Sequence, residues 1–266
     1  MTHDLLIGIC VLVALLPPGL LFLRAKPERD GLFWALLVSA VVISTGSALR
    51  LVMGAWHTGF STALWFSIAA SLILFAILAA TTRPAWRLTP LLMPYLFLVG
   101  AIALVWLKAP ERQMMMSGGP WLLIHIAVSV LTYALATLAA VAALAAFLQE
   151  RALKTKSPTP LSRQLPSVID SETMSGWLLV ACEVVLGAGL LTGVATRHME
   201  GSPLFKIDHK TLLSLLSFVV IGGLLVAHKL TGMRGRVAAR LVLVGFLLLT
   251  LAYPGVKFVT DVILTK

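Results

Sequence analysis

Long apolar runs separated by short polar segments dominate the chain. A helix needs roughly 20 mostly apolar residues to cross the hydrocarbon core of a bilayer. Eight stretches have that length, at approximately 5–23, 31–53, 60–80, 88–107, 120–148, 174–196, 211–228 and 238–261. Because backbone polar groups must be satisfied within each segment in lipid, such runs are helical. The pattern predicts an all-α fold, a polytopic transmembrane bundle of about eight helices that forms one domain over residues 1–266.

The composition agrees with a membrane protein. Of the 266 residues, 59% are hydrophobic and 12% are charged, whereas soluble domains carry about 25% charged residues. The formal net charge of +10 is of a size found in nucleic-acid-binding proteins. Here, however, the basic residues lie between the apolar runs, where they can contact anionic headgroups. We therefore expect membrane lipid as the partner of this charge, and no nucleic acid.

The order of charges around the first run predicts the orientation. Asp4 precedes this run, whereas Arg24, Lys26 and Arg29 follow it. Positive residues concentrate on the cytoplasmic side, so the run is expected to stay as a helix, with the N-terminus outside. Eight crossings then place the C-terminus outside as well. The inverted orientation is the alternative.

Histidine is the first candidate for chemistry. His125 lies about one turn inside the outer end of the fifth predicted helix, while His57 and His209 lie on the outer side and His228 on the inner side. A neutral imidazole can ligate haem iron. For each of these residues, a hydrogen-bonded interfacial side chain is the alternative interpretation. The sequence has no C-x-x-C-H segment, so it predicts no covalent c-type haem of its own.

Glu183 is the one acidic residue in the middle of a predicted helix. Ionisable residues inside the membrane are costly and often functional, so this carboxyl could relay protons or orient a ligand. A hydrogen bond to the next helix is the simpler interpretation, and the sequence favours it. No Ser-His-Asp order, P-loop or metalloprotease motif is present, so no catalytic residue is assigned.

Five segments are similar to those of a known family: WLLIHIAVSVLTY at 121–133, QLPS at 164–167, DHKT at 208–211, HKLTGMRGR at 228–236 and GFLLLTLAYPG at 245–255. The first resembles the pattern W-x-x-x-H-x-x-x-S-x-x-x-Y of the cytochrome c assembly superfamily, which includes CcsA, CcmC and HemX. The fourth resembles its H-x-x-x-G-W-R-G-R segment. Taken together, the five segments most resemble the HemX/YpjD-type inner-membrane branch.

The resemblance implies a multi-pass protein of the bacterial inner membrane that binds haem b non-covalently in cytochrome c-type biogenesis. His125 matches the outer histidine before the family's haem-handling motif, and His228 matches the inner histidine after it. His57 is more loosely matched. We therefore expect His125 and His57 as haem-iron ligands, with His209 as the alternative to His57. Partners would be other membrane proteins of the haem pathway.

Further residues acquire expected roles from these positions. Trp121 lies one turn before His125 and could pack against the porphyrin. Asp208 could orient an imidazole, and Lys210 could meet a propionate. On the inner side, Arg236 could meet a propionate near His228.

Two positions depart from the family pattern. Ile207 stands where the tryptophan-rich motif has its last tryptophan, and Ala252 stands where synthase-type members have a second outer histidine. The sequence therefore predicts an accessory haem-handling protein rather than a complete haem lyase. Two alternatives are a non-haem membrane transporter and a structural assembly partner that has lost the haem site.

Overall fold

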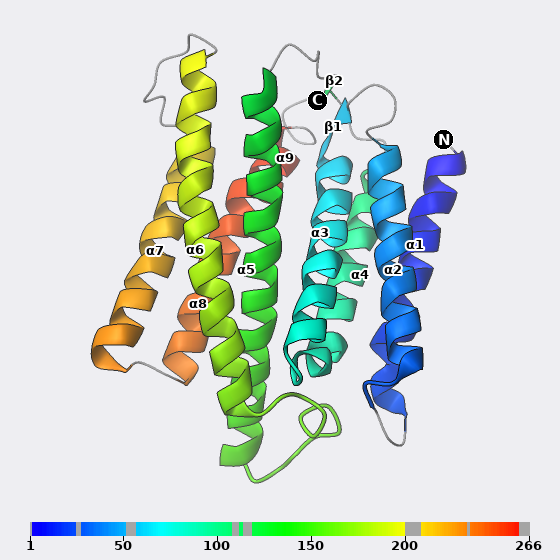
Figure 1. Ribbon diagram of the computed structural model, residues 1–266, viewed down its shortest axis with the longest axis vertical. Helices are drawn as coiled ribbons and strands as arrows, with labels where there is room; N and C mark the ends of the chain where they lie inside the picture. The colour runs from blue at the N-terminus through cyan, green and yellow to red at the C-terminus, as the bar shows by residue number, and fades with distance from the viewer. Residues whose placement is uncertain are drawn as a thin grey trace.

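The described part of the protein is a bundle of eight long helices that run in alternating directions (Figure 1). The computed structural model describes residues 2–24, 28–51, 57–107, 112–113, 119–199, 209–232 and 235–260. Its elements are α1 (Thr2–Leu20), η1 (Leu21–Leu23), α2 (Gly31–Arg50), β1 (His57–Thr58), α3 (Phe60–Thr81), η2 (Ala85–Leu88), α4 (Thr89–Val105), β2 (Arg112–Gln113), α5 (Gly119–Lys154), α6 (Val168–Met199), α7 (His209–Thr231), α8 (Arg236–Thr250), η4 (Leu251–Gly255) and α9 (Val256–Phe258). The predicted all-α bundle is confirmed, with one antiparallel pair of two-residue strands beside it.

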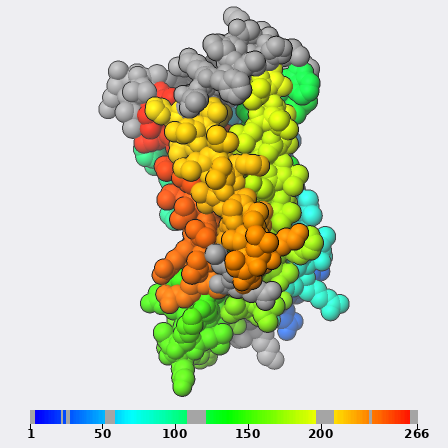
Figure 2. Space-filling model, turned by 90° about the vertical axis from the view of Figure 1, so that its left-hand side faces the viewer, coloured from blue at the N-terminus to red at the C-terminus, as the bar shows by residue number. Residues whose placement is uncertain are grey.

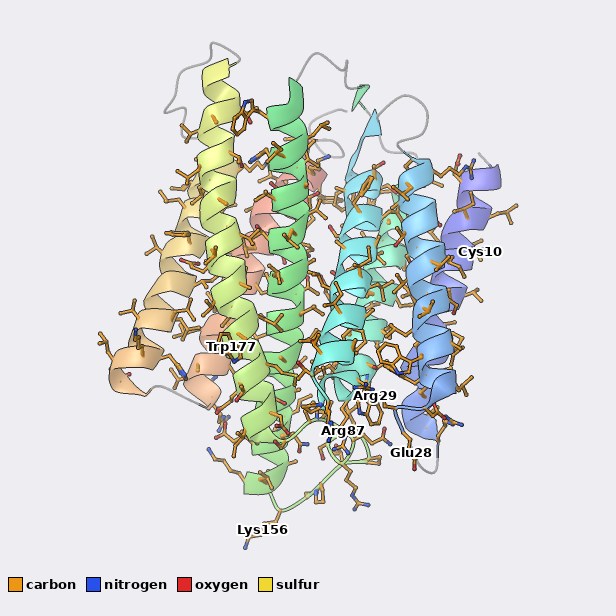
Figure 3. All side chains as sticks on the ribbon, in the orientation of Figure 1. Cys10, Glu28, Arg29, Arg87, Lys156 and Trp177 are labelled. Carbon is orange, nitrogen blue, oxygen red and sulfur yellow. The ribbon has the colours of Figure 1, made fainter. Side chains whose placement is uncertain are left out.

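The surface of the bundle fits a lipid environment. Within the described residues, seven helices are long and apolar enough to cross a membrane, and Asp4–Leu20 is a shorter apolar helix. On α6, Trp177, Val184 and Leu191 recur every seven residues and are 74%, 68% and 73% exposed. Figure 3 labels Trp177 on the lower part of α6. A soluble protein rarely exposes such an apolar stripe, so lipid is the medium that covers it.

The alanine-rich helix α5 lies at the centre of the packing. It contacts α3, α6 and α8, and its side chains from Thr132 to Ala143 are all buried. Ser175 Oγ on α6 donates a hydrogen bond of 3.1 Å to the Ala139 carbonyl of α5. Small residues let helix backbones come this close in lipid. Helix α7 packs against α6 and α8 and lies outermost on the face shown in Figure 2.

Helices α5 and α6 are longer than predicted. The sequence indicated helices over 120–148 and 174–196, whereas α5 covers Gly119–Lys154 and α6 covers Val168–Met199. Hydropathy detects only the part that lies in lipid. The residues beyond it include Glu150 and Arg151, which are good helix formers in water, and Lys154 pairs with Glu150 one turn away. The predicted inner loop 149–173 is therefore helical at both ends.

The last predicted helix, 238–261, changes its hydrogen-bond pattern near its C-terminal end. Helix α8 ends at Thr250, and Leu251–Gly255 forms a π-helical turn before α9. Pro254 lies inside this turn and has no backbone N–H to donate to the preceding turn. The widened turn is therefore attributable to this proline.

Charged side chains mark one end of the bundle. Glu28, Arg29, Arg87 and Lys156 lie at this end in Figure 3, which holds the loops that the sequence placed inside. Arg29 Nη1 donates a 2.9 Å hydrogen bond to the Ala79 carbonyl and lies 5.3 Å from the ring centroid of Trp34. This arginine thereby joins the start of α2 to the end of α3.

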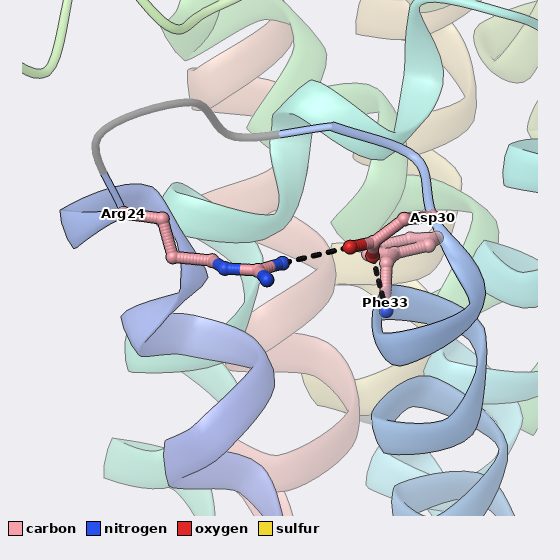
Figure 4. Close-up of polar contacts among 3 residues, drawn as sticks. All are labelled: Arg24, Asp30 and Phe33. Carbon is pink, nitrogen blue, oxygen red and sulfur yellow. Dashed lines mark hydrogen bonds and ion pairs between the residues drawn. The ribbon is translucent and has the colours of Figure 1, made fainter.

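The first of these loops is closed by a helix cap (Figure 4). Asp30 accepts a 2.9 Å hydrogen bond from the Phe33 backbone N–H, the usual contact of an N-cap residue. Arg24 Nη1 donates to the other carboxylate oxygen, also at 2.9 Å. The Phe33 N–H and Arg24 together hold the pKa of Asp30 below its usual value. The cap therefore stays ionised as the pH falls toward the ordinary range of an aspartate.

Candidate functional site

His125 is held between α5 and α6, near the end of both helices that the sequence predicts to face outside. It lies six residues after Gly119, about 9 Å along α5, and its side chain is half-buried. The Nδ1 atom is 3.2 Å from Thr192 Oγ1 on α6. A Cβ atom on Gly193 would lie 3.2 Å from the imidazole Cε1. The ring therefore occupies the space that a larger residue at position 193 would fill.

The contact with Thr192 suits one imidazole tautomer. Thr192 Oγ1 also lies 3.1 Å from the Gly189 carbonyl, to which it can donate its one proton. With the hydroxyl in that orientation, the oxygen accepts the hydrogen bond from His125 when the imidazole proton is on Nδ1. In a neutral ring the lone pair then belongs to Nε2. This is the tautomer in which histidine binds a metal through Nε2.

The other outer candidates are placed less completely. Trp121, one turn before His125, is 42% exposed at the bundle surface. His209 and Lys210 are exposed at the start of α7, which begins at the same end of the bundle as α5 (Figure 1). The backbone of His57 pairs with Gln113 between β1 and β2, but its side chain lies outside the described residues, as does Asp208. The pairing of His125 with His57 or His209 therefore stays a prediction.

His228 lines a cavity among helices α5 to α8, at the end of the bundle opposite to His125. It lies on the last turns of α7, nineteen residues after His209 and about 28 Å along the helix. The cavity lies among α5, α6, α7 and α8, and its empty space, open mouth included, is about 500 Å³. Its walls are mainly alanine, leucine and glycine, with Glu172 and Ser175 as further polar residues. The chemistry is that of an apolar pocket with a polar mouth.

A hydrogen bond fixes the mouth of this cavity. Glu172 accepts a 2.7 Å hydrogen bond from the Gly235 backbone N–H, where Gly235 has a φ of +71° that favours glycine. Next to it, the guanidinium of Arg236 lies 5.6 Å from the ring centroid of Phe147. Arg236 is exposed at this end, as its expected role at the headgroups requires.

The sequence did not identify three of these contributors: Thr192, Gly193 and Glu172. Glycines at 187, 189 and 193 are typical of close helix packing and by themselves indicate no site. The sequence shows that Thr192 lies three residues after Gly189, the spacing at which its hydroxyl can donate to the Gly189 carbonyl. It does not show that this side chain faces α5. Glu172 was part of a predicted loop because the start of α6 was placed too late.

A cluster of tyrosine side chains connects helices α4, α5 and α8. Tyr95 Oη on α4 is 3.0 Å from Tyr133 Oη on α5, and Tyr133 Oη is 3.5 Å from Thr250 Oγ1 on α8. The Tyr133 ring stacks on Phe246 with centroids 5.8 Å apart, and Tyr253 of the π-turn is also 5.8 Å away. Tyr133, the last residue of the histidine-containing segment, therefore anchors α5 to α4 and α8.

The donor set suits haem better than a bare metal ion. Among the described residues there is no group of three or more His, Cys, Asp and Glu side chains that could hold a metal. A porphyrin supplies four nitrogen ligands itself, so its iron needs only one or two axial ligands. The imidazole of His125 is a side chain of the kind that serves as such a ligand.

These features define a polytopic α-helical membrane protein with oriented or cavity-lining histidines at its two ends. Residues 31–264 match the family model described as cytochrome C assembly protein, so the chain belongs to that family. The chain is 55% identical to a protein of Azospirillum brasilense named as an uncharacterized 28.8 kDa protein in nifR3-like 5'region, over 99% of this chain and 100% of that protein. It is also 27% identical to the inner membrane protein YpjD of Escherichia coli strain K12, over 97% of each chain.

Proposed function

We propose that this protein binds haem non-covalently in the bacterial inner membrane, as an accessory protein of cytochrome c biogenesis. The observation that carries the proposal is the position of the His125 imidazole, which lies between α5 and α6 with its Nδ1 3.2 Å from Thr192 Oγ1; in the Nδ1–H tautomer its Nε2 is the atom that would bind iron. Haem b would supply an iron with open axial positions. The chain itself contributes the ligand, its orientation and an apolar surround.

The accessory role is supported by a position in the last helix. Ala252, buried in the π-turn, stands where synthase-type members have a second outer histidine. An alanine cannot ligate iron. The remaining second-ligand candidates, His57 and His209, lie outside that helix. We therefore infer retention or transfer of haem, with no bond made to its vinyl groups by this chain.

The inner cavity supports a second contact point for the same ligand. His228 and Arg236 lie near its mouth, and apolar side chains form its walls. The imidazole could contact the iron and the guanidinium a propionate. His125 and His228 lie at opposite ends of the bundle, so one iron cannot bind both. The inner cavity would serve haem on its way to or from the cytoplasmic side.

The test of the proposal is the absorption spectrum of the protein purified in mild detergent from cells with an adequate haem supply. We expect a Soret band that shifts on reduction, together with extractable haem b. A matched purification of an unrelated multi-pass protein controls for haem carried by the detergent. If the protein binds no haem even after haem is added, the proposal is wrong and the transporter and scaffold alternatives take its place.

We further propose that both termini face the periplasm. The loops expected inside share one end of the bundle, which Arg29, Arg87 and Lys156 mark in Figure 3, and positive charge is retained on the cytoplasmic side. A reporter active only in the periplasm should therefore work when fused after Lys266. The same reporter inserted within 157–165 should be inactive, and the opposite pair of results would invert the topology.

A further inference from the structure

One carboxyl group lies near the middle of the membrane, away from both histidines. Glu183 is fifteen residues after Val168 and thirteen before Thr196, the ends of the membrane-spanning part of α6. These separations correspond to about 22 Å and 20 Å along the helix. In the surrounding helices the stretches 126–148, 174–195, 211–227 and 241–256 contain no other carboxyl and no basic residue.

The Glu183 side chain packs against α7 at a glycine, where the helix has no side chain of its own. A Cβ atom on Gly222 would lie only 2.8 Å from Glu183 Oε1, so the carboxyl occupies the space of a side chain at position 222. The other oxygen, Oε2, is buried and has no hydrogen-bond partner among the described residues. One turn further along α6, a Cβ atom on Gly187 would lie 3.3 Å from Phe218 of α7. The glycines thus bring α6 and α7 close around the acid.

Nothing ionisable in the neighbouring described helices compensates a negative charge at this position. Helix α7 has no titratable residue between Lys210 and His228. On α6 the neighbouring Cys182 is directed the other way, with Sγ 3.6 Å from the Thr132 carbonyl of α5. Tyr133 and Tyr253 contact each other near α8. A carboxylate without a partner is strongly disfavoured in hydrocarbon, and binding a proton removes its charge.

We propose that Glu183 is a proton-binding site in the middle of the membrane, located between α6 and α7 and independent of haem. A metal cation is a poor alternative occupant because it needs several oxygen ligands. The described residues include no group of three His, Cys, Asp or Glu side chains to supply them. The half-buried side chain also lies within reach of small apolar molecules that dissolve in the bilayer.

Two carbodiimides distinguish a protonated carboxyl in lipid from a carboxylate in water. The carboxyl oxygen adds to the central carbon of the reagent, the carboxyl proton moves to a reagent nitrogen, and the adduct rearranges to an N-acylurea without a leaving group. The apolar reagent dicyclohexylcarbodiimide should label Glu183 in membranes at about pH 7, whereas a water-soluble carbodiimide should not. Asp170, exposed in the first turn at the inner end of α6, is the internal control and should show the reverse preference.

Mass spectrometry of the intact protein and its peptides measures the result. We expect at least about tenfold more apolar label on Glu183 than on Asp170, with complete loss of the Glu183 adduct in Glu183→Gln. The label should decline as the pH is raised, because only the protonated acid reacts. If Glu183 is not labelled, or if Asp170 is labelled equally by the apolar reagent, the site is not a proton-binding carboxyl in lipid.

Two adjacent glycines provide a matched pair of variants. Gly222→Ala places a methyl group against Glu183 Oε1, whereas a Cβ atom on Gly223 meets nothing within 4 Å. We expect the alanine at 222 to displace the carboxyl toward lipid and raise the labelling rate severalfold, with no change for Gly223→Ala. Equal labelling rates in the two variants would show that Glu183 does not pack against Gly222 between α6 and α7. The labelling needs no haem, so its outcome is separate from that of the haem proposal.

Discussion

Replacing His125 with alanine is expected to remove most of the haem that is purified with the protein. The imidazole is the proposed ligand, and the structure positions it through the contact with Thr192 and the space left by Gly193. Removing a residue that is hydrogen-bonded to a metal ligand already weakens metal binding by about 10- to 100-fold. Removing the ligand itself should therefore lower the haem affinity by more than about tenfold. Haem stoichiometry and the Soret spectrum, measured in parallel with wild type, give the result.

Thr192→Val removes the hydrogen-bond partner of His125 and leaves the histidine itself in place, so it tests the two contributions separately. Valine keeps nearly the same shape but offers no hydrogen-bonding group to His125 Nδ1, so the imidazole loses the contact with α6 that orients it. We expect haem to remain bound with roughly tenfold lower affinity and a changed spectrum. His228→Ala, at the other end of the bundle, should leave the outer site intact. Equal haem content and identical spectra in wild type and His125→Ala would remove His125 from the site.

The sequence predicted the fold well because lipid imposes a simple constraint. Every crossing must be an apolar helix, and each of the eight predicted stretches contains one, although the apolar helix in the first, Asp4–Leu20, is shorter than the other seven. The errors arise where that constraint ends. The C-terminal end of α5 and the N-terminal end of α6 lie beyond the apolar segments and are stabilised by ordinary helix formers such as Glu150. The π-turn depends on the position of Pro254 relative to its neighbours, which hydropathy does not include.

The site was predictable in part. The position of His125 near one end of α5 followed from its place in the predicted helix, and its role as a haem ligand stays a prediction based on the resemblance to the family. Its contact with Thr192 depends on how far α6 is rotated about its own axis, and no local pattern specifies that rotation. The same limit applies to Glu183. The sequence favoured a hydrogen bond to the next helix, whereas the structure places Oε1 against Gly222 and leaves Oε2 without a partner among the described residues.

The alanine-rich centre of α5 is expected to be the part of the protein most sensitive to added volume. Ala139 is fully buried, and Ser175 of α6 donates to its carbonyl at 3.1 Å. Ala139→Leu must push α5 away from its neighbours or force strained rotamers, at a cost of about 1–3 kcal/mol in the free energy of unfolding. When Ala139→Leu is heated in detergent, its helical circular dichroism should be lost at a temperature several degrees below that of wild type.

The control is the same substitution on the lipid-facing side of α6. Ala188 is exposed, so Ala188→Leu adds the same three carbon atoms without displacing a neighbour. Its effect should stay within about 0.5 kcal/mol. Close packing matters here because lipid tails are as apolar as the helix surfaces, so burial of apolar area contributes little to holding the helices together. Equal transition temperatures for Ala139→Leu and Ala188→Leu would show that the α5–α6 contact is looser than the Ser175 hydrogen bond indicates.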